Sequence, residues 1–189
     1  MNRPTVILDR DGVINADSDA YIKSVEEWQP LPGSIEAIAR FGRAGWRVVV
    51  CTNQSGVGRG LFSEAVLANI HDLLCRQVEG QGGRIDGIFY CPHRPEAGCD
   101  CRKPRPGLLR RAAETFNVDL QHVPVIGDSQ RDLDAARSVG ALPLLVRTGN
   151  GDATAAQAGN GAAAIYPDLA SAADALLQGA HRRRGQDGQ

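Results

Sequence analysis

Two aspartates separated by one residue, Asp9 and Asp11, directly follow the apolar run TVIL and precede Gly12. At the carboxyl end of a buried strand, such carboxylates are costly to desolvate unless a partner neutralises them. A third acid, Asp128, follows the apolar run VPVIG. Because oxygen-only ligands suit Mg²⁺, which also binds substrate phosphates, the three carboxylates indicate phosphoryl chemistry. The alternative is that Asp9 and Asp11 are turn residues before a glycine, where aspartate is common.

A second group of residues with metal-binding chemistry lies in the segment CPHRPEAGCDC. Its cysteines and histidine follow the spacing C-x-H-x5-C-x-C and are Cys91, His93, Cys99 and Cys101. Three thiolates and one imidazole form a closed tetrahedral set, which favours structural Zn²⁺ over the alternative of ordinary loop cysteines beside a surface histidine. This zinc loop, residues 91–103, includes Arg102 and Lys103. We expect the loop to direct both side chains toward the site that contains Asp9 and Asp11.

The elements that must position these residues are short apolar runs alternating with helical patterns. Strands are expected at 5–8, 46–52, 86–91, 123–128 and 142–148, with a weaker one at 163–166. Helices are expected from Ser34 to before Gly45 and at 63–79, 106–116, 132–139 and 169–177. This alternation predicts an α/β fold, a Rossmann-like three-layer sandwich with a mostly parallel sheet.

Ligands of such sheets bind beyond the carboxyl ends of the strands. Polar residues follow each of the first five predicted strands at that end. Beside Asp9 and Asp11 they are Thr52, Asn53, Gln54, Cys91, His93, Asp128, Ser129, Arg147 and Thr148. The sequence therefore predicts one polar edge that gathers residues from the whole chain.

Composition limits the classes of protein to consider. The 189 residues are 42% hydrophobic, which fits one soluble domain at 1–179. The net charge of −1 does not indicate binding to nucleic acid or membranes. We expect a cytoplasmic protein, because no signal or membrane-spanning run is seen. We also expect a monomer, because no exposed apolar stripe argues otherwise. The five cysteines are an odd number and do not suit a disulfide framework. The polar segment 180–189 is expected to be a disordered tail.

Four segments together resemble the motifs of the haloacid-dehalogenase-type phosphatases. They are DRDGVIN, TNQSGVGRG, CRKPRPG and GDSQRD, and they occur in the family order. The resemblance implies a haloacid-dehalogenase-like fold in which Asp9 is the nucleophile and Asp11 the general acid and then base. It also implies that Thr52 and Lys103 bind the phosphoryl group, and that Asp9, Asp128 and the Asp11 main-chain carbonyl hold Mg²⁺.

The zinc loop followed by CRKPRPG is similar to the histidinol-phosphatase branch of that family. This resemblance implies a phosphorylated sugar as substrate, with histidinol phosphate as the alternative, and gives Arg102 a catalytic part in recognising it. The substrate-binding residues that it implies are Asp9, Arg10, Asp11, Asp17, Ser18, Asp19, Ala20, Thr52, Asn53, Gln54, Ser55, Arg102, Lys103 and Ser129. Ser129 stands where the family would suggest lysine. No insertion is long enough for a large cap domain.

Other classes fit less well. A receiver-type signalling domain would end its third strand with the phosphorylated aspartate, whereas here that strand ends in Cys91. A zinc-ribbon nucleic-acid binder would need a basic face with aromatic residues, and only 5% of the residues are aromatic. Two roles stay open for Asp132, which either orients Lys103 or favours a helix N-terminus. His71 is expected to be an ordinary surface or core histidine.

Overall fold

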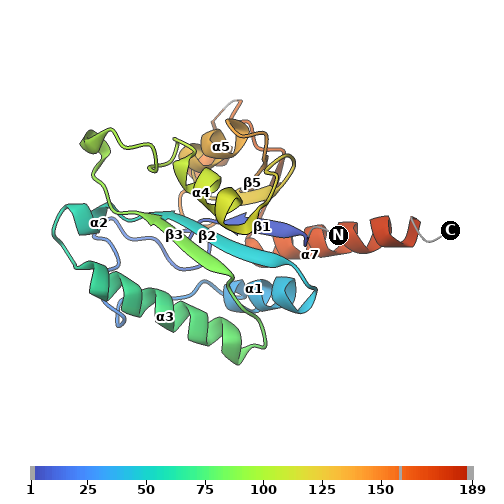
Figure 1. Cartoon of the computed structure of the whole chain (residues 1–189), viewed down its shortest axis with the longest axis horizontal. Coiled ribbons are helices and arrows are strands. Elements are labelled where there is room, and N and C mark those ends of the chain that lie inside the picture. The colour runs from blue at the N-terminus through green and yellow to red at the C-terminus, as the bar shows by residue number, and fades with distance from the viewer. Residues whose placement is uncertain (1–2, 158, 187–189) are drawn as a thin grey trace.

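The computed structural model describes residues 3–157 and 159–186, without the side chains of 180–186. Its centre is a six-stranded sheet in the order β3-β2-β1-β4-β5-β6, in which every neighbouring pair is parallel (Figure 1). The strands are β1 (Thr5–Leu8), β2 (Arg47–Asn53), β3 (Gly87–Cys91), β4 (Pro124–Gly127), β5 (Leu142–Val146) and β6 (Ala164–Tyr166). All six lie within the predicted runs or one residue beyond them.

Helices cover both faces of the sheet (Figure 1). One face carries α1 (Ser34–Arg43), α3 (Glu64–Gly80) and α7 (Leu169–Gln186), and the other carries α4 (Gly107–Phe116) and α5 (Gln130–Arg137). Short helices α2 (Ser55–Gly58) and α6 (Gly151–Ala155) follow β2 and β5, and a 3₁₀ turn, Pro95–Ala97, lies in the zinc loop. The predicted three-layer α/β sandwich is thus confirmed.

The central strand β1 shows why the sequence folds this way. Val6 and Leu8 pack into the core on the α1 side, whereas Ile7 packs into the core on the α4 side. This alternation follows from the period of two along a strand. All three side chains are buried because helices cover both faces, which explains why these three successive positions are apolar.

The structure differs from the sequence-based expectation at the C-terminus. Helix α7 continues through Gln186, so residues 180–186 are helical where a disordered tail was expected. Alanine and arginine are good helix formers, and the segment begins within a helix that is already packed at Leu169 and Leu177. The remaining three residues of the expected tail, 187–189, lie outside the described residues. In the described part of the chain, no helix is long and apolar enough to cross a membrane.

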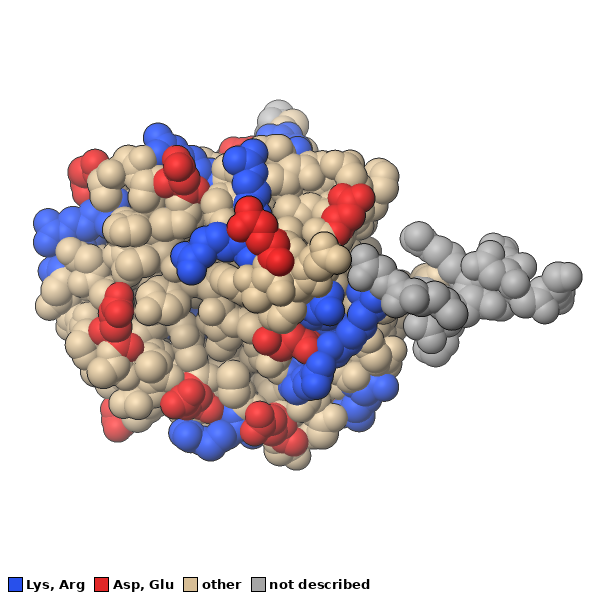
Figure 2. Space-filling model, viewed as in Figure 1, with Lys and Arg blue, Asp and Glu red and all other residues tan. Residues whose placement is uncertain are grey.

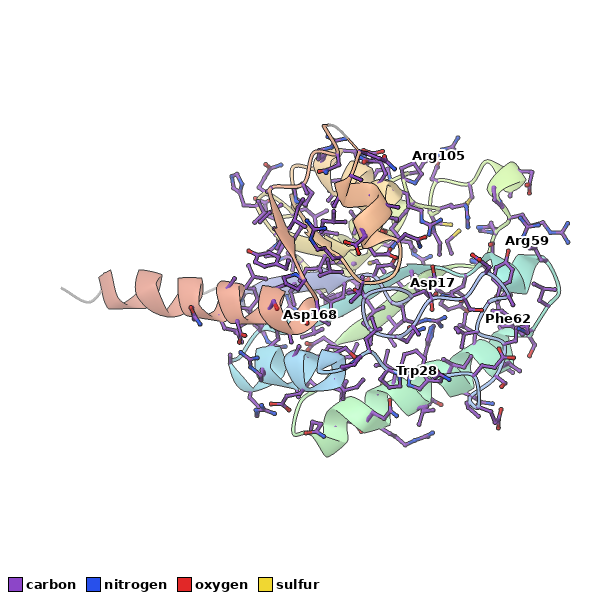
Figure 3. The ribbon with its side chains drawn as sticks, turned by 180° about the vertical axis from the view of Figure 1, so that it is seen from behind. Asp17, Trp28, Arg59, Phe62, Arg105 and Asp168 are labelled. Atoms are coloured by element: carbon purple, nitrogen blue, oxygen red, sulfur yellow. The ribbon has the colours of Figure 1, made fainter. Side chains whose placement is uncertain are left out.

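The segment between β1 and α1, residues 9–33, packs onto the protein and forms no separate domain. Val13, Ile14 and Ile22 are buried in the α1-side core, together with Trp28, whose Nε1 donates to Gln77 Oε1 on α3 at 2.9 Å. Figure 3 shows Trp28 beside α3 and Asp17 of the same segment nearer the sheet. The expectation that a large cap is absent is confirmed.

The order of the strands reverses direction at β1. The chain moves from β1 to β2 on one side and later returns to place β4 on the other. Such a switch point leaves a crevice at the carboxyl ends of the two strands, where ligands bind in parallel α/β sheets. Asp9 stands at the end of β1 and donates its main-chain N–H to Ile126 O of β4 at 2.9 Å.

Candidate active site

Asp9 is paired with a buried lysine. Lys103 Nζ lies 2.9 Å from Asp9 Oδ1 and 2.6 Å from Asp132 Oδ1, and it donates to the Cys51 carbonyl of β2 at 2.8 Å. The Lys103 side chain is only 3% exposed. A buried ammonium therefore shares its charge between two buried carboxylates, one of which borders the crevice.

The protonation of this group follows from burial and charge. Burial raises the pKa of Asp9 to about 7 against the opposing charge of Lys103, and Asp132 and Asp128 add to the increase. Burial works against ionisation of Lys103, but the charges of Asp132 and Asp9 outweigh it and raise the lysine pKa. Burial also disfavours ionised Asp132, yet Lys103 and the hydrogen bonds to Asp132 lower its pKa. Asp132 is thus the stable counter-ion, and Asp9 is the carboxylate that another cation can claim.

Asp132 fulfils both of the roles left open by the sequence. Besides its ion pair with Lys103, it accepts the Ser129 main-chain N–H at 3.1 Å and contacts the Ser129 hydroxyl, forming a capping box at the start of α5. One side chain therefore begins the helix and orients the lysine.

Asn53 fixes the main chain of the same lysine. Its Oδ1 accepts the Lys103 N–H at 3.0 Å, and its Nδ2 donates to the Lys103 carbonyl at 3.1 Å. Both bonds use the full amide group to join the end of β2 to the end of the zinc loop. The Asn53 side chain also lines the cavity above Asp9.

Asp11 is held by three neighbouring side chains. Its Oδ1 accepts from Arg10 Nε at 3.1 Å and Nη2 at 2.8 Å and from Asn15 Nδ2 at 2.8 Å. Its Oδ2 accepts from Gln54 Nε2 at 2.7 Å, and the same amide donates to Thr52 Oγ1 at 2.9 Å. Burial favours the protonated acid, but Arg10 and these hydrogen bonds lower the Asp11 pKa.

Asp128 has one oxygen engaged and one available. Its Oδ2 accepts the Asn150 main-chain N–H at 2.8 Å, while Oδ1 is buried without a hydrogen-bond partner among the described residues. Burial raises the Asp128 pKa to about 6 despite the Asn150 bond. Carboxylate oxygens of Asp9, Asp128 and Asp132 lie within 4.8 Å of one another. Because Asp132 is neutralised by Lys103, the oxygens of Asp9 and Asp128 fit a hard divalent cation such as Mg²⁺.

The zinc-loop residues converge as their spacing predicts. Sγ of Cys101 lies 3.2 Å from Sγ of Cys91 and 3.5 Å from that of Cys99, and His93 Nδ1 lies 3.2 Å from Cys101 Sγ. A tetrahedron with Zn–S bonds of about 2.3 Å has edges of about 3.7 Å, so the four donors fit Zn²⁺ with slight expansion. Arg102 Nη1 donates to the His93 carbonyl at 3.4 Å, which joins the loop to the cavity wall.

A cavity of about 220 Å³ lies above the carboxylates. Ten of its lining residues were expected at the site; they are Asp9, Asp11, Asp17, Ser18, Asp19, Thr52, Asn53, Gln54, Ser55 and Arg102. Among the expected substrate-binding residues, Arg10, Ala20, Lys103 and Ser129 do not line it, although Lys103 contacts the lining residue Asp9 from below. Arg10 is buried beneath Asp11, Ala20 is exposed on the loop, and Ser129 is turned into its capping box.

Three further lining residues were missed by the sequence analysis: Tyr21, Ile22 and Arg131. Arg131 lies within the fourth motif, in the first turn of α5, and its Nε donates to Ser129 Oγ at 3.1 Å. The serine at position 129, where the family would suggest lysine, was the signal that could have pointed to Arg131. Arg131 supplies a cationic group two residues later. On the face shown in Figure 2, basic and acidic side chains are interspersed.

Comparison with known proteins identifies the family. A family model described as HAD-hydrolase-like matches residues 100–172. The D-glycero-beta-D-manno-heptose-1,7-bisphosphate 7-phosphatase of Pseudomonas aeruginosa is 53% identical over 178 residues, which cover 94% of this chain and 100% of that protein. The chain belongs to the heptose-1,7-bisphosphate 7-phosphatase family. The expected family is thereby confirmed.

Other members of this phosphatase family agree in sequence and structure. The Bordetella bronchiseptica 7-phosphatase is 54% identical over 174 residues, covering 92% of this chain and 97% of that protein. A crystal structure of the D,D-heptose 1,7-bisphosphate phosphatase from that bacterium, complexed with magnesium and phosphate, superposes with a TM-score of 0.90. It covers 93% of this chain and 98% of its own at 54% identity. The chain is therefore a phosphatase of the haloacid-dehalogenase type.

Proposed function

We propose that this phosphatase removes the 7-phosphate from D-glycero-β-D-manno-heptose 1,7-bisphosphate with the help of Mg²⁺. The observation that carries the proposal is the pairing of Asp9 with Lys103 beside the available oxygen of Asp128. This geometry combines a nucleophile, a fixed positive charge and a cation site at the floor of one cavity. The Pseudomonas aeruginosa and Bordetella bronchiseptica relatives, which by name act on heptose bisphosphate, are more than half identical to this chain.

The proposed reaction has two steps at Asp9. First, an oxygen of the Asp9 carboxylate attacks the phosphorus, the bond from phosphorus to the sugar oxygen breaks, and Asp11 donates its proton to that oxygen. Water then attacks the phosphorus of the aspartyl phosphate and gives a proton to Asp11, which frees Asp9 and inorganic phosphate. The Thr52 hydroxyl and the Lys103 ammonium bind the phosphoryl oxygens during both steps.

Mg²⁺ would be held by the Asp9 and Asp128 carboxylates and the Asp11 main-chain carbonyl. When bound, it would supply positive charge that neutralises the charge of the phosphoryl group. Lys103 keeps the remaining carboxylate, Asp132, from competing for Mg²⁺, because the charge of Asp132 is already neutralised by the lysine. The Cys91, His93, Cys99 and Cys101 cluster would hold Zn²⁺ as a structural ion that positions Arg102 and Lys103.

The walls of the cavity support a sugar with a second phosphate. Arg102 and Arg131 both line it, and neither is used by the Asp9 pair. Arginine forks bind phosphate oxygens in pairs, so these two fit the 1-phosphate. Asp17 and Ser18 supply acceptors and a donor for sugar hydroxyls. The carboxylates of Asp17 and Asp19 would also suit the positive charge of histidinol phosphate, which makes that the second candidate.

The test is Mg²⁺-dependent phosphate release from the two heptose bisphosphate anomers and from histidinol phosphate. We expect kcat/KM to favour the β-anomer by about 100-fold, which corresponds to about 2.7 kcal/mol of transition-state discrimination. Asp9→Asn should abolish turnover of every substrate and serves as the background control. Preference for histidinol phosphate would replace the substrate while keeping the catalytic residues, and activity that survives Asp9→Asn would refute the mechanism.

A further inference from the structure

A fully buried arginine lies beneath the active site. Arg10 has 0% of its surface exposed, and its guanidinium spans both oxygens of Asp11 through Nε and Nη2. The guanidinium also lies 5.9 Å from the centre of the Trp28 ring. Burying the Arg10 guanidinium is costly unless its N–H groups donate hydrogen bonds. Each hydrogen-bond partner of the guanidinium therefore offsets part of the cost of burying its charge.

The remaining side of this guanidinium faces His71 of α3. Arg10 Nη1 lies 3.3 Å from His71 Nε2, and since a guanidinium can only donate, Nε2 is the acceptor and the ring proton resides on Nδ1. Burial, aided by the Arg10 charge, lowers the His71 pKa to about 3, so the ring stays neutral. The ring packs against that of Tyr90 with centroids 5.9 Å apart, which fixes its orientation.

We infer that Arg10 and His71 form a buried anchor that positions the Asp11 carboxyl group for proton transfer. This inference rests on the proposed phosphatase mechanism, in which Asp11 exchanges a proton with the departing oxygen. His71 belongs to none of the four motifs, and it acts on the reaction through Arg10. Both are positioning residues, since neither lines the cavity.

The hydrogen bonds distinguish the two oxygens of Asp11. Oδ1 accepts from two nitrogens of Arg10 and from Asn15, which places it on the buried side. Oδ2 accepts from Arg10 at 3.0 Å and from Gln54, whose amide also reaches Thr52 in the cavity wall. Oδ2 is therefore the oxygen on the side of the cavity.

An open site gives this anchor its importance. With no cap domain to close over the substrate, the position of the acid must be set from below, by groups already fixed in the core. The planar fork of arginine fixes both the plane and the distance of the carboxyl group, which a single-point contact would not do. His71 holds the opposite side of the fork to helix α3, whose neighbouring residues Ile70 and Leu74 are fully buried.

The leaving group separates a positioning role from a merely structural one. An alkoxide departs only with a proton from Asp11, whereas p-nitrophenolate is a stable anion and needs little protonation. Displacing Asp11 should therefore slow phosphoryl transfer from an alkyl phosphate far more than from p-nitrophenyl phosphate. A general loss of stability would lower both rates together, because it reduces the amount of folded enzyme.

The experiment compares His71→Phe, which keeps a ring against Tyr90 but removes the acceptor, with His71→Gln, which restores an acceptor at similar reach. Leu74→Val is the matched control, one turn along the same buried face of α3. We measure kcat/KM, which reports the first phosphoryl transfer, for heptose bisphosphate, glycerol phosphate and p-nitrophenyl phosphate. Thermal unfolding checks that each variant is folded.

The expected result is selective. His71→Phe should lower kcat/KM for the two alkyl phosphates by about 10- to 100-fold and leave p-nitrophenyl phosphate nearly unchanged, as for other outer-layer partners of catalytic groups. His71→Gln should recover most of the loss, and Leu74→Val should not alter the ratio. Equal losses on all substrates, or no loss on any, would overturn the inference.

Two provisions keep the outcomes distinct. If His71→Phe does not fold, Arg10→Lys tests the same anchor, because it keeps the charge but loses the fork; an unchanged substrate ratio in that variant refutes the inference. If wild-type enzyme turns over glycerol phosphate but not heptose bisphosphate, the proposed substrate is wrong while the anchor is still tested by the ratio.

Discussion

Replacing Lys103 by methionine tests the electrostatic core of the site. The side chains have similar length, so the change removes the charge and three contacts with Asp9, Asp132 and Cys51 without adding bulk. Two buried carboxylates are then left without their common cation. Removal of one partner from a buried ion pair costs about 3–5 kcal/mol, and we expect a loss of that size in the free energy of unfolding near neutral pH.

The sign of the pH dependence follows from Asp9. Its pKa is raised from 3.8 to about 7 even with Lys103 present, so between these values the folded protein holds a proton that the unfolded chain has released. Stability from such a group is present at low pH and is lost as pH rises toward the folded pKa. Without the lysine the folded pKa rises further, so the deficit of Lys103→Met should be larger at about pH 8 than at about pH 5.

Urea unfolding at the two pH values, without added Mg²⁺, measures this difference. Lys23→Met is the matched control, because Lys23 is the other lysine and pairs with Glu27 at the surface at 3.3 Å. Its substitution should leave the stability unchanged at both pH values. Phosphate release should fall by about 10²- to 10³-fold in Lys103→Met, as for the loss of other preorganised charges. A Lys103→Met protein as stable as wild type at about pH 8 would refute the reasoning.

Three further outcomes are expected. Mg²⁺ affinity should rise from about pH 5 to about pH 8, and Mg²⁺ binding should release protons. The reason is that Asp9 and Asp128, with pKa values of about 7 and 6, must ionise to bind the cation. Calorimetry in buffers of different ionisation enthalpy measures the affinity and the proton release. Gly12→Ala should weaken Mg²⁺ binding, since Gly12 has φ of 79° and an added Cβ would lie 2.1 Å from Asp128 Oδ2; unchanged affinity would contradict this. Removal of Zn²⁺ by a chelator should reduce kcat/KM, because Lys103 would lose its position. Adding back Mg²⁺ without Zn²⁺ should not restore kcat/KM.

The position of the site could be predicted because it depends on the pattern of whole strands. Apolar runs buried on both faces imply a parallel sheet, and a parallel sheet brings its carboxyl ends to one edge. Asp9, Thr52 and Asp128 therefore fall together wherever the intervening loops run. The cysteines and His93 were equally clear, because closely spaced soft ligands need only a short turn to meet.

The direction of individual side chains could not be predicted in the same way. Arg10 was assigned to the substrate by its neighbours in the motif, but the fold of residues 9–33 turns it inward to Asp11 and His71. That orientation depends on α3, which is distant in the sequence. Arg131 was missed because its contact with Ser129 depends on where α5 begins, and helix ends are the least certain feature of a sequence-based assignment.

The order of the strands also determines when the enzyme becomes competent during folding. Strand β1 lies between β2, which follows it closely in the sequence, and β4, which is formed more than a hundred residues later. The contact between Asp9 and β4 is thus among the most non-local in the chain, and such contacts form slowly because a long loop must close first. A folding intermediate containing only β1 to β3 would have Asp9, the proposed nucleophile, but no Asp128. Recovery of phosphatase activity after denaturation therefore reports completion of the sheet and not its initiation.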